Sequence, residues 1–411
     1  MTVATPLHAL RRPWGWGAVL AFALALPAAA QDMRGHGGPV RALAVASGTV
    51  ISGSFDTRAI RWDGTRPALV VRGHTGAVTA VLPLSDGGFA SGGQDGQVVT
   101  WGTGPEPVAG RRAHDAPVAA MAEVAGGVAS AGWDGRIVLP DGTAWDAHQG
   151  QATGLVAHGG GLASVGTDLR LRFWNLDGRL TASVDLVSPP AALVAEAEAV
   201  IVAGADGALR RIAPGGVLAE RSLSDRPLPV VALAMGPGVL AASSVSGEVW
   251  IVDAADFTLR TRIESGQGAV WAVAFAGETL LTGGNDGLIR RWTLAGEPLG
   301  EGSGAAIADD GSRGAQVWRA CAVCHTLDPD DGGRAGPTLH GVFGRRIGTA
   351  PDYAYSEALR RLDIVWTETT VAALFEQGPE AYTPGSRMPE QRLPDPADRA
   401  ALVDFLRANG G

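Results

Sequence analysis

Lysine is absent from this chain of 411 residues, and all 33 of its basic residues are arginine. This absence excludes catalysis through a lysine Schiff base and excludes a phosphate-binding loop that depends on lysine. The 42 acidic residues outnumber the arginines, which gives a formal net charge of -9. Binding to a phosphate backbone needs a basic surface, so we expect no nucleic-acid partner.

Cysteine is also scarce, because Cys321 and Cys324 are the only two in the chain. They are too close in sequence to join distant segments, so the fold has to be stable without structural disulfides. Glycine, in contrast, is abundant at 59 residues, about twice its average usage. This abundance favours β structure with many turns over helical bundles. The length predicts about two to three domains.

Near the N-terminus the apolar run is short, from Ala18 to Leu26, and the pair Arg11-Arg12 precedes it. Small residues, Ala28 to Ala30, follow the run, an order typical of a secretory signal peptide cleaved after Ala30. A membrane anchor is the alternative, but a spanning helix needs about 20 apolar residues. A twin-arginine signal is a further alternative that the residues after the arginine pair fit poorly. We expect residues 1–30 to be a Sec-type signal, the protein to be periplasmic, and no membrane span to remain after cleavage.

Residues 35–300 contain seven copies of one pattern: small residues, an Asp, an alternating stretch, and then Trp or an apolar residue. The copies are SGSFDTRAIRW, SGGQDGQVVTW, SAGWDGRIVLP, SVGTDLRLRFW, VAGADGALRRI, ASSVSGEVWIV and TGGNDGLIRRW. They recur about every 38 residues, a period that indicates stacked supersecondary units. Gly and Asp turns divide each copy into short segments, which predicts four strands for each unit.

This pattern resembles the WD40 family of β-propellers. The resemblance implies seven blades in a ring, and within a blade a hydrogen-bond relay of His, Ser, Asp and Trp. Complete sets are His36/Ser52/Asp56/Trp62, His74/Ser91/Asp95/Trp101 and His148/Ser164/Asp168/Trp174. A satisfied buried network of this kind makes these His and Asp residues structural rather than catalytic.

The other four repeats depart from this set. The third keeps His114, Ser130 and Asp134 but has Pro140 in place of the Trp. The fifth and sixth have lost the relay, and the seventh keeps Thr282, Asp286 and Trp292 without the His. These later blades are therefore expected to be less rigid. The strand around residues 297–301 is expected to close the seventh blade mostly by itself.

Residues 301–311 are rich in Gly, Ala, Ser and acidic side chains, which predicts a flexible linker. Beyond them, Cys321-Ala-Val-Cys324-His325 is the attachment motif of a c-type haem. Two thiols at this spacing on a helical turn reach the two vinyl groups at one porphyrin edge, and the next His presents its imidazole to the iron. A redox disulfide or a chance match is the alternative interpretation.

The surroundings of this motif resemble a class I cytochrome c, an all-α domain, over residues 312–411. Gly314 and Trp318 match residues of the family's first helix, and Leu402 and Phe405 match their partners on the last helix. In the family these two helices cross at the Gly. Asp395 is expected to cap the last helix at its N-terminus.

The resemblance implies one covalent haem c held by Cys321 and Cys324, with His325 and Met388 as axial ligands of the iron. It implies that the Pro337 carbonyl accepts a hydrogen bond from the His325 imidazole, which increases its strength as a donor. Four further residues fall where the family contacts the haem propionates: Arg345, Tyr355, Ser356 and Trp366.

Three features depart from the family. Phe375 stands where the family usually has Tyr, and Leu359 where it often has Asn, and both changes remove hydrogen bonding beside the haem. The Lys ring with which mitochondrial-type domains dock is also missing, because residues 301–411 hold 11 Arg against 16 acidic residues. A small positive rim is left by Arg334, Arg345, Arg346 and Arg387.

The sequence therefore predicts a multidomain electron-transfer protein: a seven-bladed WD40 propeller (31–300) followed by a class I cytochrome c domain (312–411). The propeller is expected to be a docking scaffold for redox partner proteins. No catalytic residue is assigned, because two axial ligands leave the iron no open position. One alternative is an oxidoreductase with a second active centre in the propeller, where His158 lies outside the relay pattern. Another is a structural protein in which the haem only stabilises the fold.

Overall fold

A computed structural model was analysed for this chain. It describes residues 1, 32–225, 228–300, 311–322, 325–327, 336–351, 353, 355–386, 388 and 391–410. The predicted signal peptide, most of the predicted linker and Cys324 lie outside these residues. In the part of the chain that is described, no helix is long and apolar enough to cross a membrane.

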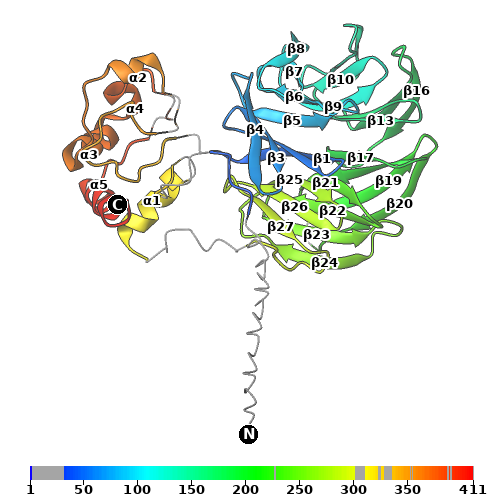
Figure 1. Cartoon of the computed structure of the whole chain (residues 1–411). Coiled ribbons are helices and arrows are strands. Elements are labelled where there is room, and N and C mark those ends of the chain that lie inside the picture. Colours follow the sequence, from blue (N-terminus) through cyan, green and yellow to red (C-terminus); the bar gives the residue numbers. More distant parts are fainter. Residues whose placement is uncertain are drawn as a thin grey trace.

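The strands between Val40 and Trp292 form seven sheets, which are the predicted blades (Figure 1). The first strand of each sheet contacts the first strands of both neighbouring sheets, and the first strand of the seventh sheet contacts that of the first. The sheets therefore close into a ring with the first strands innermost. The second strand of each blade is almost entirely buried, as the small and apolar residues of the repeats require.

The blades follow the order of the chain. Blade one consists of β1 (Val40–Ala46), β2 (Thr49–Ser54), β3 (Arg58–Asp63) and β4 (Arg66–Arg72). Blade two consists of β5 (Val78–Pro83), β6 (Phe89–Gly93), β7 (Gln97–Trp101) and β8 (Pro107–Arg112). Blade three consists of β9 (Val118–Val124), β10 (Gly127–Gly132), β11 (Arg136–Val138) and β12 (Ala144–Asp146). Blade four consists of β13 (Ala152–His158), β14 (Gly161–Gly166), β15 (Arg170–Trp174) and β16 (Leu180–Asp185).

The last three blades complete the ring. Blade five consists of β17 (Pro190–Ala195), β18 (Val200–Gly204), β19 (Ala208–Ala213) and β20 (Gly216–Ser222). Blade six consists of β21 (Val230–Gly236), β22 (Val239–Ser244), β23 (Glu248–Asp253) and β24 (Leu259–Glu264). Blade seven consists of β25 (Val270–Ala276), β26 (Thr279–Gly284) and β27 (Ile289–Trp292).

The outer edge of blade seven differs from the expectation. Pro298 forms an antiparallel bridge with Trp292, as predicted for the segment that follows β27. At the other end of β27, however, Met33 pairs with Ile289 through two backbone hydrogen bonds of 2.9 and 3.1 Å. Met33 is also buried, with 1% of its surface exposed. The expectation that residues 297–301 close the blade mostly by themselves was therefore incomplete, because an N-terminal residue shares the closing position.

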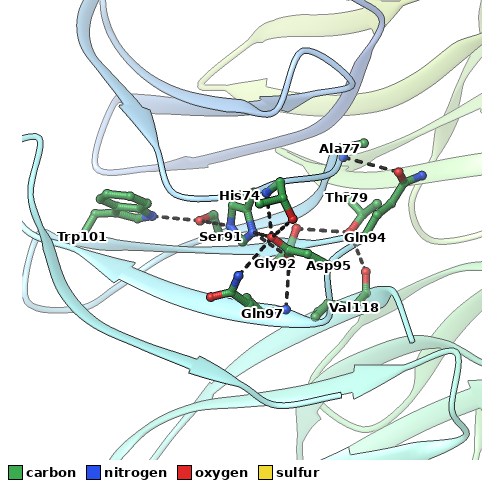
Figure 2. Close-up of polar contacts among 11 residues, drawn as sticks. His74, Ala77, Thr79, Ser91, Gly92, Gln94, Asp95, Gln97, Trp101 and Val118 are labelled. Atoms are coloured by element: carbon green, nitrogen blue, oxygen red, sulfur yellow. Dashed lines mark hydrogen bonds and ion pairs between the residues drawn. The ribbon is translucent and has the colours of Figure 1, made fainter. Parts of the chain in front are cut away.

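The predicted relays are present in the first four blades. In blade two the Trp101 indole donates to Ser91 Oγ at 2.8 Å, and Ser91 lies 2.8 Å from His74 Nε2 (Figure 2). His74 Nδ1 in turn lies 3.0 Å from an Asp95 carboxylate oxygen. Equivalent bonds join the sets that contain His36 and His148, and the set that contains His114 lacks only the Trp. These His and Asp residues hold the blades together, as the sequence predicted.

Blade seven also has a relay, which the sequence analysis did not find. Gln267 takes the place of the His: its side-chain amide nitrogen donates to Asp286 at 3.0 Å, and its carbonyl oxygen accepts from Thr282 at 2.5 Å. Trp292 completes the chain by donating to Thr282 at 2.9 Å. Gln can replace neutral His here because its amide also offers a donor nitrogen and an acceptor oxygen.

Replacing Asp95 by Ala is expected to destabilise the propeller by roughly 1–3 kcal/mol, because His74 and two backbone N–H groups lose their acceptor. Urea unfolding of fragment 31–300, followed by tryptophan fluorescence, measures the difference. Asp86→Ala is the matched control, since Asp86 caps an exposed turn of the same blade. An equal effect of the two substitutions would contradict the structural role of the relay.

The relay also makes the stability of the propeller depend on pH. Burial lowers the pKa of His114 and of His148, against the opposing effect of their Asp partners. The unfolded chain therefore takes up protons before the folded one does as the pH falls below about 6.5, and stability falls with it. We expect a lower unfolding temperature at pH 5 than at pH 7. His148→Gln, which copies Gln267, is expected to reduce that difference, and an unchanged pH dependence would argue against His148 as a source.

The C-terminal part forms a small helical domain beside β4 in Figure 1. Its helices are α1 (Arg313–Ala322), α2 (Glu357–Arg361), α3 (Glu368–Gln377), α4 (Pro379–Tyr382) and α5 (Pro396–Asn409). Helices α1 and α5 cross at Gly314, where an added Cβ would lie only 2.7 Å from the Phe405 Cβ. Asp395 caps α5 by accepting the Ala397 N–H at 2.8 Å. Both features confirm what the sequence predicted.

Candidate functional site

The helical domain encloses a cavity of about 440 Å³. Eight residues that the sequence predicted for the site line it: Cys321, His325, Pro337, Arg345, Tyr355, Ser356, Trp366 and Met388. The remaining wall is mainly apolar and includes Leu339, Val342, Ile347, Val371, Leu374, Leu402 and Leu406. The fold thus brings together residues from a sequence span of more than sixty positions. The ninth predicted residue, Cys324, lies outside the part of the chain that the structure describes.

His325 is held in one orientation. Its Nδ1 donates to the Pro337 carbonyl at 2.9 Å, as the sequence predicted. This bond fixes the tautomer in which Nε2 carries the lone pair that can bind a metal ion. Gly336 lies directly against the ring, and an added Cβ there would stand 2.6 Å from His325 Nδ1. Only glycine therefore allows the backbone to approach the imidazole so closely.

Met388 is presented by a tight turn after α4. The Thr383 hydroxyl donates to the Pro379 carbonyl at 2.9 Å, and the Ser386 N–H donates to the Thr383 carbonyl at 3.0 Å. The Met388 N–H then donates to Ser386 Oγ at 3.1 Å. These bonds direct the Met388 side chain against the core of the domain, where it packs beside the buried cluster that contains Phe375.

The polar part of the wall is ordered by hydrogen bonds. Arg345 donates to the carbonyls of His340 and Thr338 at 3.1 and 2.6 Å. Burial disfavours the charged form of both side chains, so it lowers the pKa of Arg345 and raises the pKa of the neighbouring Tyr355. Ser356 begins α2 and donates to the Gly385 carbonyl at 3.1 Å, which ties α2 to the Met388 turn. One side of the cavity therefore offers a cationic group and hydroxyls among apolar residues.

The two positions where the chain departs from the family both line the cavity. Phe375 is buried on α3, and Leu359 lies on α2. Neither side chain can donate a hydrogen bond, so the wall is apolar at these two positions.

Sequence reasoning missed two polar lining residues. Tyr353 packs edge-on against Tyr355, with ring centroids 4.7 Å apart, and the closely spaced aromatic pair could have indicated it. Arg72 belongs to the propeller, at the end of β4, and also lines the cavity. No sequence signal points to Arg72, because its nearness depends on how the two domains meet.

The histidines of the propeller are mostly engaged in the relays. His158 is the exception, and its ring packs on Phe173 with centroids 5.4 Å apart. Among the residues that the structure describes, no three His, Cys, Asp or Glu side chains lie close enough together to hold a metal ion.

Comparison with known proteins gives matches for both parts of the chain. The profile of the cytochrome c family matches residues 311–409, and that of the WD domain, G-beta repeat, matches residues 65–102. Cytochrome c of Arabidopsis thaliana is 37% identical over 102 residues, which cover 25% of this chain and 90% of that protein. Cytochrome c2 of Rhodomicrobium vannielii is 32% identical over 118 residues, covering 29% of this chain and 94% of that protein.

The structure also resembles that of a designed protein. The crystal structure of the computationally designed Ika8 protein superposes with a TM-score of 0.52 at 24% identity, covering 66% of this chain and 91% of that one. At this level of identity the likeness concerns the fold alone.

Proposed function

Since residues 311–409 of this chain belong to the cytochrome c family, we propose that the protein is a periplasmic electron carrier with one haem c. Cys321 and Cys324 attach the haem covalently, and His325 and Met388 are the axial ligands of its iron. The propeller docks redox partner proteins. Electrons enter and leave through the helical domain, and the propeller takes no part in the chemistry.

One observation carries this proposal: the predicted residues that the structure describes line a single cavity. Cys321 from α1, Pro337 from the loop after it, Trp366 before α3 and Met388 before α5 come from separate segments of the domain and line the same cavity. In addition, the hydrogen bond from His325 to the Pro337 carbonyl holds the imidazole in the orientation that metal binding requires.

The residues fit a haem in their chemistry. One imidazole and one thioether are the donor set of electron-carrying c-type cytochromes. The apolar wall suits a porphyrin ring, and Arg345 with Tyr355 and Ser356 offers a cation and hydroxyls to carboxylate groups. A cavity of this kind would not suit a hydrophilic substrate, because most of its wall has no hydrogen-bonding group.

Each side chain then has a defined task. A haem bound here supplies one-electron chemistry, because its iron changes between two oxidation states. His325 and Met388 would both bind the iron, which would leave no position on the metal for a substrate. Phe375 and Leu359 present apolar side chains to the cavity. The propeller contributes Arg72 of β4 to the cavity wall, but it contributes none of the proposed ligands of the iron.

Electron transfer is tested with the full-length protein, expressed with a signal peptide and the haem maturation machinery. Spectroelectrochemistry is expected to show one reversible one-electron step, and stopped-flow mixing with a small inorganic donor is expected to reduce the iron in full. The ferrous protein is expected not to bind carbon monoxide, because the sixth position is filled. Irreversible reduction, or ready binding of carbon monoxide, would contradict the proposal.

The docking role is tested by removing the propeller. Fragment 312–411 is expected to keep the haem spectrum and the rate of reaction with small donors, because every proposed ligand lies within it. Its reaction with a native partner is expected to be slower than that of the full-length protein at the same haem concentration. Equal rates over a range of low concentrations would show that the propeller adds no affinity.

A further inference from the structure

The first strands surround the centre of the propeller ring, and this central space is called the channel. The first strands surround the axis, yet most of their residues are only half-buried, as in β1, β17 and β21. In an innermost strand this exposure means that solvent enters the centre of the ring. The first and second strands of a blade are antiparallel, and Val40 at the start of β1 pairs with Ser54 at the end of β2. The start of each first strand therefore lies at the same end of the channel as the turn between the second and third strands.

The residues that follow the second strands form the rim of this opening. In six blades the first residue after the second strand donates its backbone N–H to the carbonyl of a residue just before the first strand. The pairs are Phe55 with Pro39, Gln94 with Ala77, Trp133 with Pro117, Thr167 with Gln151, Ala205 with Pro189 and Asn285 with Ala269. These bonds hold the six rim residues against the inner strands, and so around the channel mouth.

Arg41, the second residue of β1, lies just inside this rim. Its guanidinium carbon is 5.9 Å from the centroid of Trp271, the second residue of β25 in the neighbouring blade. The Trp271 indole N–H donates to the side-chain oxygen of the rim residue Asn285 at 2.7 Å. Asn285 thus fixes the Trp271 ring, and the ring supports the guanidinium by a cation–π contact.

Arg41 differs from the other arginines near this end of the propeller. Arg58, Arg172, Arg210 and Arg290 each form an ion pair with the Asp of their own blade. Within the described residues, no Asp or Glu forms an ion pair with Arg41, and the equivalent positions of the other blades carry no charge. Those positions are Thr79, Ala119, Thr153, Ala191, Val231 and Trp271. Burial lowers the pKa of Arg41 without an opposing carboxylate. A partly desolvated guanidinium of this kind can bind an anion, because its N–H groups can donate hydrogen bonds to the anion's oxygen atoms.

The rim around Arg41 carries exposed aromatic side chains. Phe55 and Trp133 are 46% and 45% exposed, and Leu169, two residues after the rim residue Thr167 of blade four, is 37% exposed. Their turns belong to blades one, three and four, so the apolar surface extends over several blades. Exposed aromatic residues and an arginine at the same end of the propeller are the composition typical of protein-binding surfaces.

We propose that the channel mouth of the propeller binds an acidic segment of a partner protein, with an Asp or Glu carboxylate on Arg41 and apolar neighbours on Phe55 and Trp133. The apolar rim argues for a protein segment over a small carboxylic acid, because a small acid would fill the Arg41 position and leave the aromatic residues exposed. This inference rests on the docking role of the propeller proposed above, and it names the surface and the chemistry of the partner.

The test is a selection of random peptides displayed on phage against the immobilised full-length protein. We expect the enriched peptides to share an Asp or Glu next to apolar residues. Synthetic copies of these peptides, measured by fluorescence anisotropy, are expected to bind Arg41→Gln at least about tenfold more weakly, because the carboxylate loses its charged donor. Replacing their acid by the matching amide is expected to weaken binding to the unmodified protein to the same extent. Arg112→Gln is the matched control, since Arg112 is exposed at the outer strand of blade two.

Two further variants separate recognition from loss of folding. Arg41→Lys keeps the charge but loses the two-pronged donor, and is expected to bind with intermediate affinity. Trp271→Leu removes the support of the guanidinium and is expected to weaken the same peptides, while thermal unfolding reports whether each variant is folded. Failure to enrich any peptide, enriched peptides without an acid, or equal binding to Arg41→Gln would overturn the proposal. These readouts do not involve electron transfer, so they can fail while the proposed redox function stands, and the reverse also holds.

Discussion

A chain with both Cys321→Ala and Cys324→Ala is expected to retain no haem after extraction with acidified acetone. The thioether bonds formed by these two cysteines are the only covalent attachment the chain can make, because it has no other cysteine. The unmodified protein is expected to keep one haem for each chain under the same treatment. The measurement is the haem absorbance of the extracted protein relative to its concentration.

The double variant is informative because fragment 31–300 has no cysteine and is expected to remain folded and colourless. Loss of colour would therefore report the helical domain alone. Haem that stays covalently bound to the double variant would show that this motif is not the site of attachment.

Replacing Met388 by His is expected to lower the midpoint potential of the haem by a few tenths of a volt, within the range of about 0.8 V over which axial ligands set haem potentials. An imidazole donates more strongly to ferric iron than a thioether does, and so favours the oxidised state. The substitution keeps a ligand at the same turn, so the haem itself is expected to remain bound. The potential is measured by spectroelectrochemistry of the full-length protein.

Met235→His is a suitable control, because Met235 lies on β21 of the propeller, away from the cavity. It is expected to leave the potential and the ligand-field bands unchanged. If Met388→His also leaves both unchanged, Met388 is not the sixth ligand.

Much of the helical domain could be predicted because its determinants are local. The Cys-x-x-Cys-His motif, the cap at Asp395 and the small residue at Gly314 are each defined by a short stretch of sequence. The convergence of the lining residues could be predicted only through the resemblance to a family. No periodicity in the sequence places Trp366 and Met388 beside the same cavity.

The relays show where pattern matching fails. The sets that contain His74 and its equivalents were found because the residue types repeat at a fixed period. Gln267 was missed because it is a different residue type. Its side chain nevertheless places a donor nitrogen and an acceptor oxygen where the His of the other relays places its two ring nitrogens. The geometry of the blade decides which side chain can complete the network, and a residue pattern does not contain that geometry.

Seven repeated β units followed by a helical haem-binding domain could be predicted from residue patterns. Repeat period, turn residues and the haem motif are local, and local residues set local structure. Three contacts could be found only in the folded chain: Met33 shares the outer edge of blade seven, Arg72 enters the wall of the cavity, and Arg41 lies on Trp271. Each of these contacts joins residues more than two hundred positions apart, and they meet because the ring closes and the two domains pack together.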